Sequence, residues 1–481
     1  MHLSVISRII GFFSMGFSVT ILIPLLISVF YQDGETADFA LCFAITFGTG
    51  LVFWVPTRKH KAELATRDGF VVVALFWSFI SLLASLPFIF SQEMSLTDAL
   101  FESVSAFTTT GATVMVGLDH LPHSLLFYRQ QLQWFGGMGM IVLAVAILPM
   151  IGIGGMQLYR AEAPGPLKEE KLTPRLKQTA RTLWLIYVGI TVANAFAYWL
   201  AGMSGFDAIA HALSTVSTGG FSTHDASFGY FDSAPIEMIA VIFMLLGACN
   251  FSIHYLAFRN HSLLAYWRNM EVRTFLLVVL SAIALVTLML YFSKGYDELP
   301  PDLRNATFEV VSVITSTGYG TVDFSAWPDF LPVFLILISF IGGCGGSTAG
   351  GLKVMRVILL VQMGYREIRR LIHPRALFSV RIDNTVVSSR TIEAVWGFFA
   401  MYIVSFGILM LLMIHNGLDQ VSAFSAIATC MNNMGPGLGQ VASNFASVSE
   451  GGKLIAVVAM LLGRLEVFTI LVLLTPEFWR K

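Results

Sequence analysis

The chain alternates long apolar segments with shorter polar connections over its whole length. A helix needs about 20 predominantly apolar residues to cross the hydrocarbon core of a bilayer. Ten segments meet this requirement, and we expect each to form a spanning helix: 8–30, 38–56, 69–90, 126–150, 182–202, 234–258, 273–293, 330–355, 392–415 and 453–475. The pattern therefore predicts an all-α integral membrane protein whose first two helices form a hairpin.

Four shorter, moderately apolar segments lie between pairs of these helices, and each ends in a polar turn that contains glycine. The turns are Thr108-Thr109-Thr110-Gly111-Ala112, Val216-Ser217-Thr218-Gly219-Gly220-Phe221, Thr315-Ser316-Thr317-Gly318-Tyr319-Gly320 and Asn432-Asn433-Met434-Gly435-Pro436-Gly437. Phe101-Glu102 and Phe308-Glu309 stand nine to ten residues before their glycines. One such turn is ordinary loop punctuation, but four in equivalent places predict an internal repeat.

The repeat predicts four helix–pore-loop–helix units around one central pore. The third turn is similar to the T-V-G-Y-G loops of K⁺ channels, in which backbone carbonyls replace the hydration shell of the ion. We divide the chain into the hairpin (1–68), repeat one (69–150), a link with repeat two (151–258), repeat three with a glycine-rich stretch and a link (259–390), and repeat four (391–481).

The composition indicates the class of protein, and the distribution of charge indicates its orientation in the membrane. The chain is 56% hydrophobic and 12% charged, whereas soluble proteins carry about 25% charged residues. Its four cysteines lie in apolar or pore-adjacent segments, so we expect free thiols. Lys and Arg gather in 57–68, 151–181, 259–273 and 353–390 and are rare in the alternate loops. Because positive loops face the cytoplasm, we expect both termini to be cytoplasmic and the four turns to enter from outside.

The second helix of repeat three contains a stretch that an ordinary helix would not tolerate. Six glycines fall between residues 341 and 351, and each costs roughly 1 kcal/mol relative to Ala in a helix. Irregular backbone at membrane depth is tolerated only where protein or a water-filled cavity satisfies it. We interpret the stretch as an intramembrane loop beneath the pore turns and as a gate; the alternative is a kinked packing helix. The gating glycines are Gly342, Gly343, Gly345, Gly346, Gly350 and Gly351.

The last predicted helix carries Arg464 and Glu466 within an apolar run. Ionisable residues inside a membrane are functional candidates. Arg464 is predicted either to form an electrostatic barrier in the ion path or to hold the glycine-rich loop. The alternatives are a structural pair with Glu466 and a side chain that extends to the interface.

Several motifs together resemble the Trk/Ktr/HKT superfamily of potassium transporters, over essentially the full length. They are Gln133-Trp134-Phe135-Gly136-Gly137-Met138-Gly139, Gly219-Gly220-Phe221-Ser222-Thr223-His224-Asp225-Ala226, Asn432-Asn433-Met434-Gly435-Pro436-Gly437-Leu438-Gly439 and Gly463-Arg464-Leu465-Glu466. The N-terminal hairpin narrows the resemblance to membrane subunits of bacterial Trk systems.

The resemblance implies roles for individual residues. The filter glycines would be Gly111, Gly219, Gly318 and Gly435, and the carbonyls that line the path would include those of Thr109, Thr110, Ser217, Thr218, Ser316, Thr317, Asn433 and Met434. The stretch 342–351 would be the gating loop, and Arg464 the pore-facing arginine. Since the second and fourth turns depart from the channel pattern, we expect K⁺ selectivity that also admits Rb⁺ and some Na⁺.

The resemblance also implies partners and location. The chain would be a homodimer in the bacterial inner membrane, with one pore per protomer, docked on a cytoplasmic TrkA-type ring that binds the nucleotide (ATP, ADP or NADH). We expect no cofactor and no nucleic-acid partner for this chain, and we interpret the cationic link 151–181 as a surface for lipid headgroups or a soluble partner.

The predicted function is K⁺ uptake through a gated filter. The alternative is a proton- or sodium-coupled symporter with alternating access, whose broken midplane helices would look similar. An enzyme is disfavoured, because no metal-spaced cluster or nucleophile motif is present in the sequence.

Overall fold

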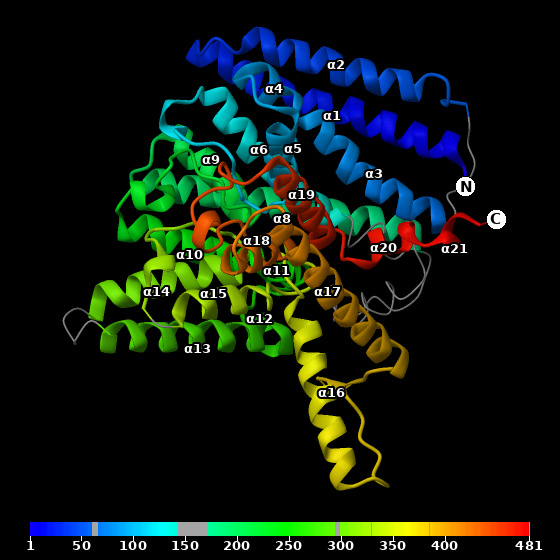
Figure 1. Cartoon of the computed structure of the whole chain (residues 1–481), viewed down its shortest axis with the longest axis vertical. Coiled ribbons are helices and arrows are strands. Elements are labelled where there is room, and N and C mark those ends of the chain that lie inside the picture. Colours follow the sequence, from blue (N-terminus) through cyan, green and yellow to red (C-terminus); the bar gives the residue numbers. More distant parts are fainter. Residues whose placement is uncertain (60–65, 143–171, 294–298, 329, 384, 481) are drawn as a thin grey trace.

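The computed structural model describes residues 1–59, 66–142, 172–293, 299–328, 330–383 and 385–480. The fold is a bundle of helices with one short antiparallel hairpin, β1 (Arg381–Ile382) and β2 (Thr385–Val386). Figure 1 shows the two termini close together on one side of the bundle, and α16 extending away from it. Most of the cationic link predicted to bind lipid lies outside the described residues.

The N-terminal hairpin is formed as predicted. Its helices are α1 (Leu3–Tyr31) and α2 (Thr36–Trp54), which pack along each other (Figure 1). A Cβ at Gly11 would lie 2.7 Å from the carbonyl oxygen of Gly50, and one at Gly50 would lie 2.9 Å from that of Gly11. Small residues therefore allow the two backbones to touch, as is common where helices cross in membranes.

Each of the four repeats contains a long first helix, a short pore helix and a second helix. The first helices are α3 with α4 (Thr66–Ala84, Leu86–Gln92), α8 (Leu172–Leu200), α13 (Met270–Ser293) and α17 (Ser389–His415). The pore helices are α5 (Leu96–Phe107), α9 (Gly205–Val216), α14 (Leu299–Ile314) and α18 (Gln420–Asn432). The second helices begin with α6 (His123–Val142), α10 (Ala234–Ala248), α15 (Leu331–Ser339) and α19 (Glu450–Arg464).

The remaining elements are short connections and continuations. Between each pore helix and its second helix lies one 3₁₀ turn: η1 (Leu118–His120), η4 (Ser227–Tyr230), η5 (Phe324–Ala326) and η6 (Gly439–Val441). The second helices continue as α11 (Phe251–Arg259), α16 (Val354–Ile372) and α20 (Phe468–Leu474), and α12 (Leu264–Arg268) and α21 (Pro476–Trp479) complete the described helices.

Three of the ten predicted spans, all second helices, are not continuous helices; in one of them, 330–355, the glycine-rich stretch was predicted to be a loop. Six helices in the described part of the chain are long and apolar enough to cross a membrane, and two further spans are bent pairs. The pair α10–α11 bends by 99° and the pair α19–α20 by 114°. In the predicted span 330–355 the helix ends at Ser339, and residues 340–353 are irregular. The apolar pattern continues across the bends of the two bent pairs, so hydropathy alone could not locate them.

Capping explains one of these breaks. Asn250 follows α10, and its side chain accepts a hydrogen bond from the backbone N–H of Ser252, 2.8 Å away. An Asn at this position satisfies one of the free N–H groups that open a new helix. The chain therefore starts α11 in a new direction inside an apolar segment.

Candidate ion pathway

The four turns that follow the pore helices have the same backbone geometry. Thr109, Thr218, Ser316 and Asn433 all have positive φ, between 51° and 56°. Two residues further on, Gly111, Gly220, Gly318 and Gly435 have φ between 80° and 91°. The residue between them donates its N–H to a pore-helix carbonyl at 2.8 or 2.9 Å in every copy. We call these four segments the filter turns.

This geometry corrects the predicted register of the second turn. The glycine equivalent to Gly111, Gly318 and Gly435 is Gly220, and Gly219 takes the place of Thr110 and Thr317. The family resemblance implied Gly219 as the filter glycine of the second turn. The second turn therefore contributes Thr218 and Gly219 at the positions that Thr109 and Thr110 occupy in the first, and Ser217 corresponds to Thr108.

The filter turns close into a ring. A Cβ at Gly111 would overlap the carbonyl oxygen of Gly219, and the same holds for Gly220 with Thr317 and for Gly318 with Met434. The ring is completed by Gly435, where a Cβ would lie 2.9 Å from the carbonyl oxygen of Thr110. Each repeat thus touches the next, and the fourth touches the first. One chain therefore surrounds one axis.

A small vestibule of about 90 Å³ lies directly on this ring. It is lined by the four positive-φ glycines, with Arg129, Phe221 and His224 among the residues of its wall. It places Gly220, and not Gly219, beside the other three glycines, in agreement with the backbone angles. Within the described residues no group of three or more His, Cys, Asp or Glu side chains could hold a metal ion. Backbone carbonyl oxygens of the four turns lie at this ring.

Hydroxyl contacts within the turns and between repeats support the filter turns, and one of the residues that make them, Thr215, was not predicted from the sequence. Thr108 and Thr110 share a 2.7 Å hydroxyl contact, and Thr315 and Thr317 share one of 2.8 Å. The hydroxyl of Tyr319 lies 3.2 Å from that of Thr215, in the neighbouring repeat. These contacts hold the filter backbone in place without projecting side chains into the ring.

A buried ion pair of repeat one lies beside the vestibule and contacts repeat two through its arginine. Glu102, on α5, lies 2.8 Å from Arg129, on α6, and both side chains are almost fully buried. The guanidinium of Arg129 also lies 4.1 Å from the ring centre of Phe221 and 3.3 Å from the carbonyl oxygen of Ser222. Glu102 additionally accepts the N–H of Val114. Breaking a buried pair of this kind costs roughly 3–5 kcal/mol, so this cluster fixes the first two turns together.

The irregular segment 340–353, which we call the glycine-rich loop, lies against the filter turns. Thr348 donates its hydroxyl to the carbonyls of Val216 and Gly247, at 3.1 and 3.0 Å. Gly350 donates its N–H to the hydroxyl of Ser316, 2.6 Å away. A Cβ at Gly350 would overlap the carbonyl oxygen of Asn432. The loop therefore contacts repeats two, three and four at once.

The six glycines that were predicted to form the gate have different structural roles in the loop. Gly342, Gly346 and Gly351 have φ between 68° and 74°, a region that other residues avoid. A Cβ at Gly343 would lie 2.9 Å from the carbonyl oxygen of Ala248. Gly345 donates its N–H to Glu271 at 2.7 Å. The segment is an irregular loop, which contradicts the alternative of a kinked helix.

Arg464, at the end of α19, connects the glycine-rich loop to repeat one. Its guanidinium donates to the carbonyl of Thr348 at 2.9 Å and to that of Gly136 at 3.0 Å, and the side chain is buried. Glu466 pairs instead with Arg356, at 2.7 Å. The contact of Arg464 is therefore with the loop, not with Glu466.

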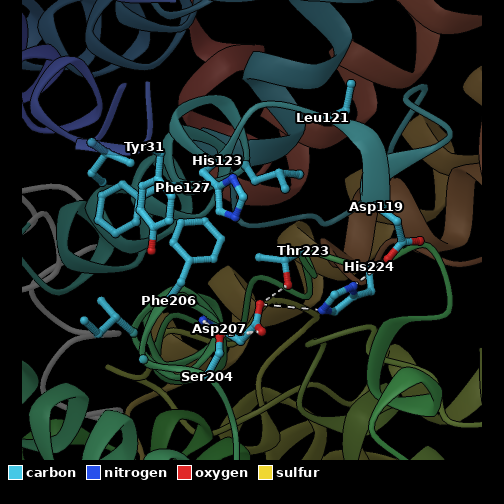
Figure 2. A pocket seen from close by; sticks show the side chains of 14 residues that line it. Tyr31, Asp119, Leu121, His123, Phe127, Ser204, Phe206, Asp207, Thr223 and His224 are labelled. Atoms are coloured by element: carbon cyan, nitrogen blue, oxygen red, sulfur yellow. Dashed lines mark hydrogen bonds and ion pairs between the residues drawn. The ribbon is translucent and has the colours of Figure 1, made fainter. Parts of the chain in front are cut away.

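Charged side chains also gather on the filter-turn side, next to a cavity of about 610 Å³ (Figure 2). The imidazole of His224 lies 2.5 Å from Asp119 and 3.6 Å from Asp207, and it stacks on Tyr230. Burial lowers the pKa of His224, but the hydrogen bonds and charges of Asp207 and Asp119 outweigh it, so the pKa is raised above its usual value of 6.5. His224 therefore forms a clasp between repeat two and Asp119 of repeat one.

We predict that this clasp weakens at alkaline pH. A group whose pKa is raised by folding stabilises the fold fully below its unfolded pKa and loses that contribution as pH rises through the folded pKa. The melting temperature of the purified protein should fall as pH rises above 6.5, by an amount equivalent to about 1 kcal/mol. His224→Gln should remove this part of the pH dependence; a His224→Gln profile parallel to wild type would contradict the assignment.

The fold and the ring define a class of protein: a helical membrane protein whose four pore-loop repeats close into one ring. The family model for TrkH cation transport proteins matches residues 35–481, and the chain belongs to this family. It is 52% identical to the Trk system potassium uptake protein TrkH of Salmonella typhimurium and 51% identical to that of Escherichia coli K12, over the full length of all three chains. Members of this family are transport proteins, not enzymes.

A solved relative has the same fold. The crystal structure of the potassium transporter TrkH from Vibrio parahaemolyticus superposes with a TM-score of 0.93 at 48% identity, covering both chains completely. The predicted all-helical membrane architecture and the family resemblance are confirmed by these matches.

Proposed function

We propose that this protein takes up K⁺ through the ring of filter turns, with one pore in each chain. The observation that carries the proposal is the closed ring, in which each positive-φ glycine faces a carbonyl of the next repeat. Glycine permits backbone angles that aim carbonyls at an ion, and such carbonyl rings dehydrate K⁺ in channels. Three relatives that match along the full chain are named as potassium uptake or potassium transport proteins.

The pore helices add to the stabilisation of a dehydrated cation. Each of the four ends directly at its filter turn, so its carboxyl end lies beside the ring. A helix carries a partial negative charge at this end. Four such ends favour a cation over an anion on the axis.

The glycine-rich loop and Arg464 form the proposed gate. The loop meets three repeats, and Arg464 ties it to Gly136 of the first. A loop held in this way obstructs the path below the ring, and a partner that pulls it aside would open the pore. All four repeats have the same orientation. This favours a gated pore over an alternating-access transporter, which usually contains inverted repeats.

The proposal includes an orientation and partners. The protein would lie in the bacterial inner membrane with both termini in the cytoplasm, as a homodimer on a TrkA-type nucleotide-binding ring, with no cofactor of its own. Support for a protein contact comes from α16, which projects from the bundle (Figure 1) and exposes Val361, Ile368 and Leu371 near Arg369 and Arg370. A large exposed apolar face marks an interaction site.

Selectivity is tested by competition. The purified protein in liposomes should take up ⁸⁶Rb⁺, and external K⁺ should suppress the uptake at concentrations at least about tenfold below those of Na⁺. Equal competition by K⁺ and Na⁺ would contradict a K⁺ filter. Protein-free liposomes provide the background.

The gate is tested by Thr348→Val, which keeps the side-chain shape and removes the hydroxyl bonded to Val216 and Gly247. A hydrogen bond contributes about 1 kcal/mol, so we expect ⁸⁶Rb⁺ flux without a partner protein to rise about threefold to tenfold. Ser347→Ala is the matched control, because its hydroxyl bonds only within the loop, to Cys344. A rise in the control equal to that of Thr348→Val would remove the gating role of these contacts.

A further inference from the structure

We propose that Gln133, on the second helix of repeat one, is a positioning residue of the filter. Its carboxamide occupies the place of the side chain that the second filter turn lacks at Gly219, and it fixes the carbonyl of Gly219 in the ring. This inference rests on the proposed function of the filter turns. It assigns a role in selectivity to a residue outside all four turns.

The other three filter turns carry a buried side chain at this position. These side chains are Thr110, Thr317 and Met434, and all are fully buried. Thr110 is held by Thr108 and by the amide of Asn433, 3.0 Å away. Protein interiors are close-packed. Gly219, the equivalent residue of the second turn, has no side chain and would leave a void behind the ring unless another group filled it.

Gln133 fills this space. A Cβ at Gly219 would overlap the Cδ and Oε1 atoms of Gln133 and would lie 2.9 Å from its Cβ. The Gln133 side chain is itself fully buried. The second turn therefore has glycine at two consecutive positions for two different reasons: Gly220 provides the positive φ of the ring, and Gly219 makes room for Gln133.

The amide also bonds to the filter backbone on both sides of Gly220. Nε2 donates to the carbonyl of Gly219 at 2.5 Å, and Oε1 accepts the N–H of Phe221 at 3.1 Å. The carbonyl of Gly219 is the ring oxygen that faces Gly111. Gln133 thus sets the position of one of the four ring oxygens, and its N–H group is a hydrogen-bond donor to this oxygen. Its loss should alter the preference among cations more than it alters folding.

The test removes the glutamine side chain from the helix, adds a threonine side chain to the turn, and combines the two changes. Gln133→Ala should lower the preference for K⁺ over Na⁺, measured by competition against ⁸⁶Rb⁺ uptake, by about tenfold. Gly219→Thr alone should be at least as damaging, because the threonine collides with Gln133. The double variant Gln133→Ala/Gly219→Thr should recover the preference to within about threefold of wild type, because the second turn then resembles the first and third.

Gln131→Ala is the matched control. Gln131 is a buried amide on the same helix, but it donates to the carbonyl of Thr20 in the hairpin and does not bond to the filter. Its loss should leave cation preference unchanged. An equal change in Gln131→Ala, an unchanged preference in Gln133→Ala, or a double variant no better than Gly219→Thr would overturn the proposal.

A second readout separates this inference from the proposed function. Gln133→Ala and Gly219→Thr should be coupled in thermal stability, with the double variant melting above Gly219→Thr alone, whether or not the protein transports K⁺. Wild-type protein without K⁺ preference would refute the filter itself. Coupling in stability without any change in preference would make Gln133 a packing residue and refute its role in selectivity.

Discussion

Gly318→Ala should reduce K⁺ uptake at least about tenfold and abolish the preference for K⁺ over Na⁺. An alanine at φ +82° costs about 1–2 kcal/mol. Its Cβ would also overlap the carbonyl oxygen of Met434, so this oxygen must move away from the ring. A tenfold loss corresponds to about 1.4 kcal/mol, which the displaced oxygen alone can supply. The measurement is ⁸⁶Rb⁺ uptake with K⁺ and Na⁺ as competitors.

Gly320→Ala is the control for this prediction. Gly320 belongs to the same turn, but its φ is not positive, and an added Cβ would find only the carbonyl oxygen of Val322, at 3.8 Å. Its uptake should equal that of wild type. If Gly318→Ala kept its K⁺ preference, or if both variants lost it equally, the ring geometry would not determine selectivity.

Arg464→Lys should increase flux in the absence of a partner by about tenfold. Lysine keeps the positive charge, but it cannot reproduce the two bonds from the guanidinium to Thr348 and Gly136. A hydrogen bond to a charged group contributes about 1.5–3 kcal/mol, and losing one shifts a closed–open equilibrium about tenfold. The measurement is ⁸⁶Rb⁺ uptake by the purified chain without any added partner.

Comparison of two Arg464 variants shows whether Arg464 holds the glycine-rich loop or acts only as a positive charge in the ion path. If Arg464 acts only through its charge, Arg464→Lys will behave like wild type and Arg464→Ala will raise flux. If Arg464 holds the loop, both variants will raise it. Arg356→Lys is the control, because Arg356 is also buried and its guanidinium pairs with Glu466, 2.7 Å away. Equal flux in Arg356→Lys and Arg464→Lys would indicate general loosening of the bundle.

Periodicity and hydropathy were sufficient for the hairpin and for the first helix of each repeat, because these are long and apolar without interruption. They failed at the bends of the second helices. The bend at Asn250 depends on a single cap, and the one after Arg464 on positive φ at Glu466 and Val467. Such breaks depend on tertiary contacts, which a hydropathy window does not contain. The glycine-rich loop was predictable, because its glycine density is incompatible with a helix.

The filter was predictable in outline and not in detail. The four turns stand out as a repeat, but only backbone angles could decide between Gly219 and Gly220. Gln133 appeared in a motif without an assigned role, because a single glutamine on an apolar helix has no pattern that points to a distant turn. The sequence singled out Arg464 as a residue that could hold the loop, and its bond to Thr348 required the folded chain.

The most direct measurement uses the purified chain in liposomes loaded with K⁺. Uptake of external ⁸⁶Rb⁺ is followed with and without a proton ionophore. A passive pore predicts uptake that is driven by the K⁺ gradient and insensitive to the ionophore. Uptake that requires an imposed pH gradient, or that the ionophore abolishes, would contradict the pore and would make the protein a coupled symporter.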